Sequence, residues 1–255
     1  NVVPVSCSEV AEMTKVFENV FRCVNIALVN ELARLCELMG ISVWEVIDTT
    51  STKPYGYMPF YPGPGIGGHC IPLDPYYLAS KAKEYDFHTK FIELAADINE
   101  QMPYYVTYRI MESLNNYGKS IKAANLLILG VAYKKDVSDI RESPSIKLIQ
   151  LLLEKGAKIS YNDPYVDSCQ ILGNTLNCVN LTKECLSSAD CVIITTDHSD
   201  YDYQYIVDNS SLVFDTRGVT RQIIAKNIIR LGEPGSGILA SSWEMYDDLV
   251  LACID

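Results

Sequence analysis

The sequence predicts an α/β protein in which a helical domain is followed by a doubly wound domain built on a parallel sheet. In residues 1–118, apolar residues recur at helical spacing on both sides of one loop rich in glycine and proline. Beyond residue 124, apolar runs of strand length alternate with helical segments, as in a parallel sheet that helices cover on both faces. We therefore expect one domain at 1–118 and a second at 119–255.

The first domain begins with the longest predicted helix. Ser6 and Glu9 have the spacing of a capping box, and the apolar stripe that follows ends at Gly40, a residue type common just after helices. A helix of about thirty residues spans roughly 45–50 Å. Such a length suggests that it spans domains or packs in a dimer. Ser42 and Glu45 then have the spacing that starts a short second helix.

Residues 62–75, with the sequence PGPGIGGHCIPLDP, cannot form a regular helix or a central strand and are predicted to be a shaped loop. Asp74 as N-cap and Pro75 in the first turn would start a helix that ends near residue 85. Another helix is expected from about residue 89, interrupted at Pro103 and ended at Gly118.

The second domain alternates strands and helices. The apolar run 125–132 is the first predicted strand, and Ser143 with Pro144 starts a helix that ends at Gly156. Further strands are expected at 157–161, 191–196 and 212–215, with a short helix at 182–189. Ligands of such sheets bind beyond the carboxyl ends of the strands. The side chains expected there include Tyr133, Lys134, Lys135, Asp163, His198, Asp215 and Arg217.

Composition narrows the class of protein. The 255 residues are 48% hydrophobic and 21% charged, which is typical of a globular protein with a substantial core. The net charge of −11 argues against nucleic acid as a partner, and no apolar run reaches the length of a membrane span. Nine cysteines without a C-x-x-C pair predict a reducing, cytoplasmic location and no metal site.

Cys70 is the strongest candidate for chemistry. A thiol among free backbone N–H groups near a helix N-terminus can act as a nucleophile. The alternative is a free buried cysteine in a tight loop, without a chemical role. Asp74 could help to activate a water or could be only a helix cap. His69 is a poor base for Cys70 because adjacent side chains point apart.

Lys15 and Asn19 lie four residues apart and therefore share a helical face, where they could stabilise an oxyanion. The alternative is an ordinary solvated stripe. The glycine loop is not a dinucleotide fingerprint, because no strand precedes it and His69 and Cys70 replace the third glycine. Cations that follow the predicted strands instead suggest a diphosphate or nucleotide ligand, or else simple surface charge. They are Lys134, Lys135, Arg141 and Arg217.

Several separated motifs, in order, resemble the UDP-glucose/GDP-mannose dehydrogenase family over nearly the whole chain. They are AEMTK at 11–15 with Asn19, NELA at 30–33, the loop 65–74, GVAYKKD at 130–136 and RESP at 141–144. The resemblance implies oxidation of a nucleotide-sugar alcohol at C6 to the acid with two NAD⁺. It also implies a central dimer-forming helical domain and a Rossmann-like UDP-sugar-binding domain.

By the same resemblance, Cys70 is the nucleophile that forms a thiohemiacetal and then a thioester. Lys15 and Asn19 stabilise the oxyanion, and Asp74 assists the water. The substrate-binding residues implied are Gly65, Gly67, Gly68, Tyr133, Lys134 and Arg217, and Arg141 reaches towards NAD.

Two departures from the family pattern bear on the substrate. Leu73 stands where UDP-glucose members have lysine, and this favours the branch acting on UDP-N-acetylhexosamines, with UDP-N-acetylglucosamine the expected substrate. Near Lys53 and Pro54, where relatives place an arginine that reaches a neighbouring subunit, there is none.

The family's N-terminal NAD-binding half has no counterpart in the sequence. We expect the main NAD site to lie outside this chain, and the chain alone to have little or no dehydrogenase activity. The alternatives are a non-catalytic UDP-sugar-binding and dimerisation module, a UDP-glucose 6-dehydrogenase, and a thiol hydrolase built on Cys70 and His69.

Overall fold

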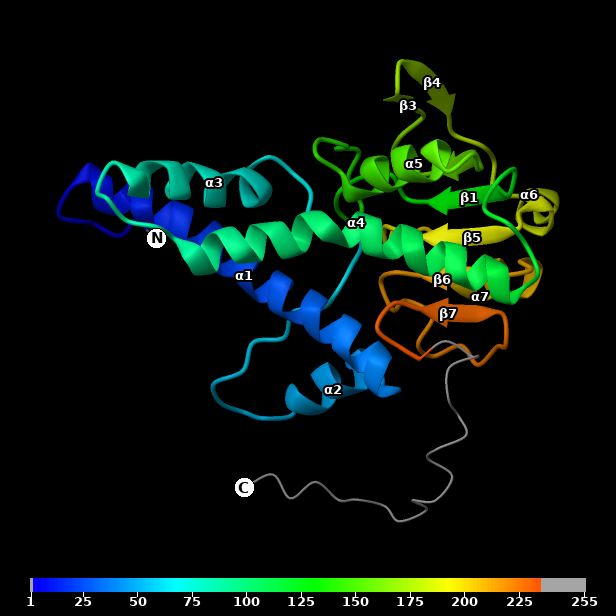
Figure 1. The fold of residues 1–255 in the computed structure, drawn as a ribbon, viewed down its shortest axis with the longest axis horizontal. Coiled ribbons are helices and arrows are strands. Elements are labelled where there is room, and N and C mark those ends of the chain that lie inside the picture. The colour runs from blue at the N-terminus through cyan, green and yellow to red at the C-terminus, as the bar shows by residue number, and fades with distance from the viewer. Residues whose placement is uncertain (1, 235–255) are drawn as a thin grey trace, which may run out of the picture.

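The computed structural model describes residues 2–234 and joins a helical part to a parallel sheet (Figure 1). Its first four helices are α1 (Ser8–Met39), α2 (Val43–Thr50), α3 (Cys70–Lys83) and α4 (Lys90–Asn116). Gly40 ends α1 in the left-handed conformation at φ 74°, and the Ser42 side chain caps α2 by accepting from the Glu45 N–H. These two local predictions are confirmed.

The second part holds a five-stranded sheet in the order β2-β1-β5-β6-β7, and every pairing in it is parallel. The strands are β1 (Asn125–Leu129), β2 (Lys158–Asn162), β5 (Cys191–Ile194), β6 (Val213–Asp215) and β7 (Ile228–Arg230). Helices α5 (Pro144–Glu154), α6 (Lys183–Ser188) and α7 (Tyr203–Asn209) connect them. The predicted fold class, helices followed by a Rossmann-like parallel sheet, is confirmed.

Different helices cover the two faces of the sheet. Alternate side chains of β1 divide between them, with Leu126 and Ile128 on one face and Leu127 and Leu129 on the other. The first face packs against α4 and α5, and the second against α6 and α7. Because α4 continues from the helical part onto the sheet (Figure 1), it fixes one part against the other. The division at residue 118 stays a prediction.

Three predictions about the helices were wrong. Helix α3 starts at Cys70 and not after Asp74: Pro72 falls in its first turn, where a missing N–H has no intrahelical partner to lose, and Pro75 lies inside the helix. Helix α4 runs unbroken through Pro103 because its second half is held by packing on the sheet. Ser6 caps nothing: Cys7 is the N-cap of α1, and Ser8 donates instead to the Glu9 carboxylate.

The structure adds elements that the sequence did not indicate. An antiparallel hairpin of β3 (Ser168–Ile171) and β4 (Asn174–Asn177) follows β2, and α7 and β7 complete the sheet domain. Within residues 2–234, no helix is long and apolar enough to cross a membrane. The eight cysteines described are all free. Cys253 and the stretch 235–255 of the second predicted domain lie outside the described residues.

Candidate active site

Cys70 is exposed at the first position of α3, directly after the glycine-rich loop. The N-cap before it is His69. The first turn of a helix presents N–H groups without intrahelical partners, and these favour negative charge. The helix therefore begins about one turn earlier than the sequence suggested, and the thiol lies inside its first turn instead of before it.

Tyr133 lies against the loop immediately before Cys70. A Cβ at Gly67 would approach the Tyr133 Cβ to 2.6 Å, and one at Gly68 would approach the Tyr133 ring to 2.9 Å. The Gly68 N–H also donates to the Arg141 carbonyl over 3.0 Å. Glycine is required here because no other residue leaves room for the loop that follows β1. Three predicted substrate-binding residues, Gly67, Gly68 and Tyr133, thus lie together, and Gly68 is two residues before Cys70 in the sequence.

Arg217 lies at the other end of the same loop. A Cβ at Gly63 would come within 2.7 Å of the Arg217 Nη1, and the Arg217 Nε donates to the Thr195 carbonyl over 2.8 Å. Asp215, at the end of β6, accepts from the Arg217 N–H over 2.8 Å. Burial lowers the pKa of the Arg217 guanidinium, against the carboxylates of Asp197 and Asp215.

A hollow of about 440 Å³ opens beside Arg217. The Trp44 and Tyr61 rings in its wall stack with centroids 5.9 Å apart, and the Arg221 guanidinium lies 5.2 Å from the Trp44 ring centre. Aromatic faces beside guanidinium groups suit a flat base joined to phosphate. The sequence did not indicate Trp44 or Tyr61, because nothing local marks two aromatic residues on different elements as neighbours.

Asn19 and Asp74 are brought together. The Asn19 side chain is buried, and its Nδ2 donates to the Asp74 Oδ2 over 2.6 Å. Helix α3 runs antiparallel to α1 (Figure 1), so Cys70 lies one turn before Asp74 and towards the C-terminal side of Asn19. Lys15 lies one turn of α1 before Asn19, on the side away from Cys70. It is exposed, and its Nζ lies 3.0 Å from the Glu18 carboxylate. The catalytic roles of these four residues stay predictions.

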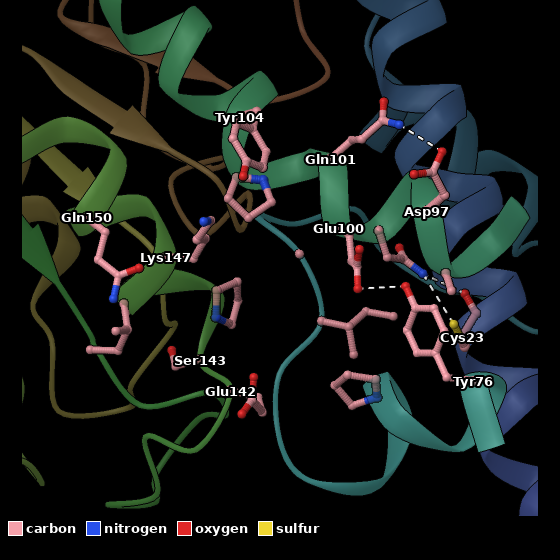
Figure 2. Close-up of a pocket in the computed structure, with 18 of the residues that line it drawn as sticks. Cys23, Tyr76, Asp97, Glu100, Gln101, Tyr104, Glu142, Ser143, Lys147 and Gln150 are labelled. Atoms are coloured by element: carbon pink, nitrogen blue, oxygen red, sulfur yellow. Dashed lines mark hydrogen bonds between the residues drawn. The ribbon is translucent and has the colours of Figure 1, made fainter. Parts of the chain in front are cut away.

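A larger cavity of about 670 Å³ lies behind the loop, between α3, α4 and α5 (Figure 2). Gly65 and Ile66 form part of its wall. In its wall, the Tyr76 hydroxyl donates to Glu100 over 2.6 Å, and the Lys147 ammonium lies 5.3 Å from the Tyr104 ring centre. The loop therefore passes between two hollows, with Cys70 at its end.

Two buried amides hold the loop by hydrogen bonds; the sequence assigned a role to neither, although Asn30 is the first residue of the motif at 30–33. The Asn30 Oδ1 accepts from the Gly63 N–H over 3.0 Å, while its Nδ2 donates to the Asn99 Oδ1 over 2.9 Å. The Asn99 Nδ2 in turn donates to the Cys23 carbonyl. The available signal was Asn30 itself, an amide on the apolar face of a long helix between Ala27 and Ala33.

Little in the described residues suits a dinucleotide. Gly130 after β1 is not followed by further glycines, and Arg141 is exposed and paired with Asp139 over 2.6 Å. This pairing lowers the pKa of the Asp139 carboxyl to about 2. Lys134 is exposed on the loop that follows β1. The location of the main NAD site outside these residues stays a prediction.

Comparisons with known proteins agree with the motifs. Residues 9–101 match the central domain of the UDP-glucose/GDP-mannose dehydrogenase family, and residues 127–222 match its UDP-binding domain. A UDP-N-acetyl-D-mannosamine dehydrogenase of Methanococcus maripaludis is 38% identical over 220 residues, which is 83% of this chain and 48% of that protein.

Solved structures give the same result. The UDP-D-ManNAc dehydrogenase of Pyrococcus horikoshii is 32% identical with a TM-score of 0.74, over 88% of this chain and 52% of that one. An NDP-N-acetyl-D-galactosaminuronic acid dehydrogenase from Methanosarcina mazei Go1 is 28% identical with a TM-score of 0.76, over 89% and 51%.

The expected substrate, UDP-N-acetylglucosamine, is not supported: the names of these three proteins contain mannosamine or galactosaminuronic acid and not glucosamine. The chain spans about half the length of the curated relatives it matches. Members of the family are NAD-dependent nucleotide-sugar dehydrogenases. The chain belongs to the UDP-glucose/GDP-mannose dehydrogenase family, of which it carries the central and UDP-binding domains.

Proposed function

We propose that this chain is the substrate-binding and nucleophile-bearing part of an NAD-dependent UDP-N-acetylhexosamine 6-dehydrogenase. The observation that carries the proposal is the path of one loop, which touches Arg217 at Gly63 and Tyr133 at Gly67 and Gly68, and then delivers Cys70. A UDP-sugar laid along this loop would have its nucleotide beside Arg217 and its sugar towards the thiol.

In the proposed reaction the C6 alcohol loses a hydride and a proton and becomes an aldehyde. The Cys70 thiolate adds to the carbonyl carbon to give a thiohemiacetal, and loss of a second hydride gives a thioester. Water then breaks the carbon–sulfur bond, releases the carboxylate and restores the thiol. NAD⁺, when bound, supplies the hydride acceptor, with one NAD⁺ used for each of the two hydrides. We place its main site outside these residues and assign Arg141 an outlying contact.

The oxygen on the reacting carbon gains negative charge when the thiolate adds. Asn19 Nδ2 carries two N–H groups, of which Asp74 occupies one, so the second can donate to this oxygen. We propose that Lys15, one turn from Asn19 along α1, stabilises the same negative charge. Asp74 would activate the water that attacks the thioester.

The sugar is the finer part of the proposal. Leu73 favours an acetamido sugar, and the relatives' names support the mannosamine epimer over the glucosamine that we first expected. We therefore propose UDP-N-acetyl-D-mannosamine as the preferred substrate, and little dehydrogenase activity for this chain alone.

We also propose a homodimer formed through α1. Its exposed apolar side chains form a stripe at helical spacing: Val10, Met13, Phe17, Phe21 and Leu28. Within the described part of the chain, Phe17 and Leu28 are each 62% exposed. Apolar surface of this extent on one helix is typical of a protein–protein contact.

Protection of Cys70 from alkylation tests the proposed site. With iodoacetamide as probe and mass spectrometry of the digested chain, saturating UDP-N-acetyl-D-mannosamine should slow alkylation of Cys70. Cys7, the other exposed cysteine described, is the internal control and should react at an unchanged rate. Equal alkylation of Cys70 with and without the sugar nucleotide would contradict the proposal.

A further inference from the structure

The loop that follows β1 carries Tyr133 and Lys134, yet it has no regular structure of its own. It also includes Asp136, whose φ of 58° lies in the left-handed region that residues other than glycine seldom adopt. Such a conformation persists only where surrounding contacts hold it. The contacts that hold this loop come from the ends of two other strands.

Asp163, at the end of β2, holds the start of the loop. Its Oδ2 accepts from the Val131 N–H over 2.7 Å and from the Ala132 N–H over 3.0 Å, the two residues immediately before Tyr133. The same oxygen lies 3.1 Å from the Nε2 of His198. Both side chains are buried, Asp163 to 2% and His198 to 0% exposure.

His198, beyond the end of β5, holds the far side of the loop. Its Nδ1 accepts from the Asp136 N–H over 3.0 Å, and the Asp136 carboxylate accepts from the N–H and the hydroxyl of Ser199. The imidazole itself is fixed between the rings of Tyr165 and Tyr201, at centroid distances of 5.0 and 5.8 Å.

The hydrogen bonds assign the imidazole proton. Because Nδ1 accepts from a backbone N–H, the neutral ring must carry its proton on Nε2, where it donates to Asp163. Neither ring nitrogen is left to exchange a proton with a substrate. An acid–imidazole pair with this bonding can therefore hold a backbone but cannot act as a general base.

We propose that Asp163 and His198 are positioning residues that hold Tyr133 and Lys134 in the geometry that receives the UDP-sugar. The pair links the two sides of the loop through one imidazole, so its loss frees both sides together. The proposal rests on the proposed function, since the ligand that the loop receives is the UDP-sugar of that site.

Calorimetric titration with UDP, together with thermal unfolding, tests the proposal on three variants of this chain. His198→Leu removes both hydrogen bonds and should weaken UDP binding by at least about tenfold, equivalent to 1.4 kcal/mol. His198→Asn keeps an acceptor where Nδ1 lies and should recover most of the affinity. His88→Leu, a change at an exposed histidine, is the matched control and should bind as the wild type does.

The tautomer supplies a readout that needs no variant. The chain has three histidines, so ¹⁵N spectra of histidine-labelled protein should show one buried ring with its proton on Nε2. A proton on Nδ1 of that ring would overturn the proposal. So would UDP binding by folded His198→Leu that equals the wild type, while the proposed function would survive either result. A wild-type chain that binds no UDP would instead overturn the proposed function and this inference with it.

Discussion

Asn19 on α1 donates from Nδ2 to the Asp74 Oδ2 on α3 over 2.6 Å and so joins the two helices one turn from Cys70. The pair brings a buried amide and a carboxylate together across 55 residues of sequence. A hydrogen bond to a charged group is stronger than one between neutral groups. The bond therefore stabilises the helix pair and orients both side chains beside the thiol.

Asn19→Ala should lower the free energy of unfolding by about 1.5–3 kcal/mol, because it leaves the Asp74 carboxylate without its amide partner. Urea denaturation measures this loss. Asn25→Ala is the control on the same helix, since its side chain bonds only a carbonyl one turn away in α1 among the contacts described. Equal losses for the two variants would contradict the assignment.

Gly68→Ala should lower the free energy of unfolding by more than backbone strain alone accounts for. Gly68 and Gly173 both have left-handed backbones, at φ 86° and 79°, so alanine at either costs about 1–2 kcal/mol. Only at Gly68 would the new Cβ meet a ring, that of Tyr133 at 2.9 Å. Denaturation should show an additional loss of about 1–3 kcal/mol for Gly68→Ala. An equal loss at Gly173 would count against the contact with Tyr133.

Asp163→Asn should destabilise the chain in a pH-dependent way. Burial tends to raise the pKa of the Asp163 carboxyl, but hydrogen bonds from His198 and from the N–H groups of Tyr165, Ala132 and Val131 outweigh it, and its pKa lies below the usual range. Its contribution to stability is present above the unfolded pKa, about 3.9, and is lost as the pH falls through the folded value.

At pH 7 the Asp163→Asn variant should lose about 1–3 kcal/mol, because the amide cannot accept from all the donors that face the carboxylate. The difference from wild type should begin to shrink below about pH 4, where the Asp163 carboxylate of the unfolded chain takes up a proton, and should continue to shrink until the pH reaches the lower pKa of the folded protein. Denaturation at a series of pH values measures it. A difference that grew with acidity would show that the pKa shift has the opposite sign.

Leu28→Asp should convert the proposed dimer into a monomer, because a carboxylate in a buried apolar contact has no partner. Sedimentation equilibrium gives the mass directly. Leu172→Asp, at a leucine 57% exposed near the turn of the β3–β4 hairpin, is the control and should leave the mass unchanged. A dimer that survives Leu28→Asp would exclude this stripe as the interface.

Local signals in the sequence were sufficient where local geometry decides the outcome. Gly40, Ser42 and Ser143 each cap a helix where expected, since a cap depends on a few adjacent residues. The buried strands β1 and β5 were also found, because side chains covered on both faces give continuous apolar runs.

Tertiary packing decided the rest. Helix α4 tolerates Pro103 because the sheet holds its second half, and β3, β4 and β7 are too short or too polar to leave a pattern. In the candidate site, the sequence predicted the glycine-rich loop and named Cys70 at its end, whose catalytic role stays a prediction. It could not find Asn30 with Asn99, which lie 69 residues apart and meet only in the folded chain.

The central claim is that UDP binds beside Arg217, at the start of the loop that delivers Cys70. Calorimetric titration of this chain with UDP tests it most directly, with Arg217→Ala as the variant and Arg34→Ala, on α1 over the Tyr105 ring, as the matched control. We predict one site in the wild type, an affinity at least about tenfold weaker in Arg217→Ala, and no change in Arg34→Ala. Equal UDP affinity in all three proteins, or no binding by the wild type, would contradict the account.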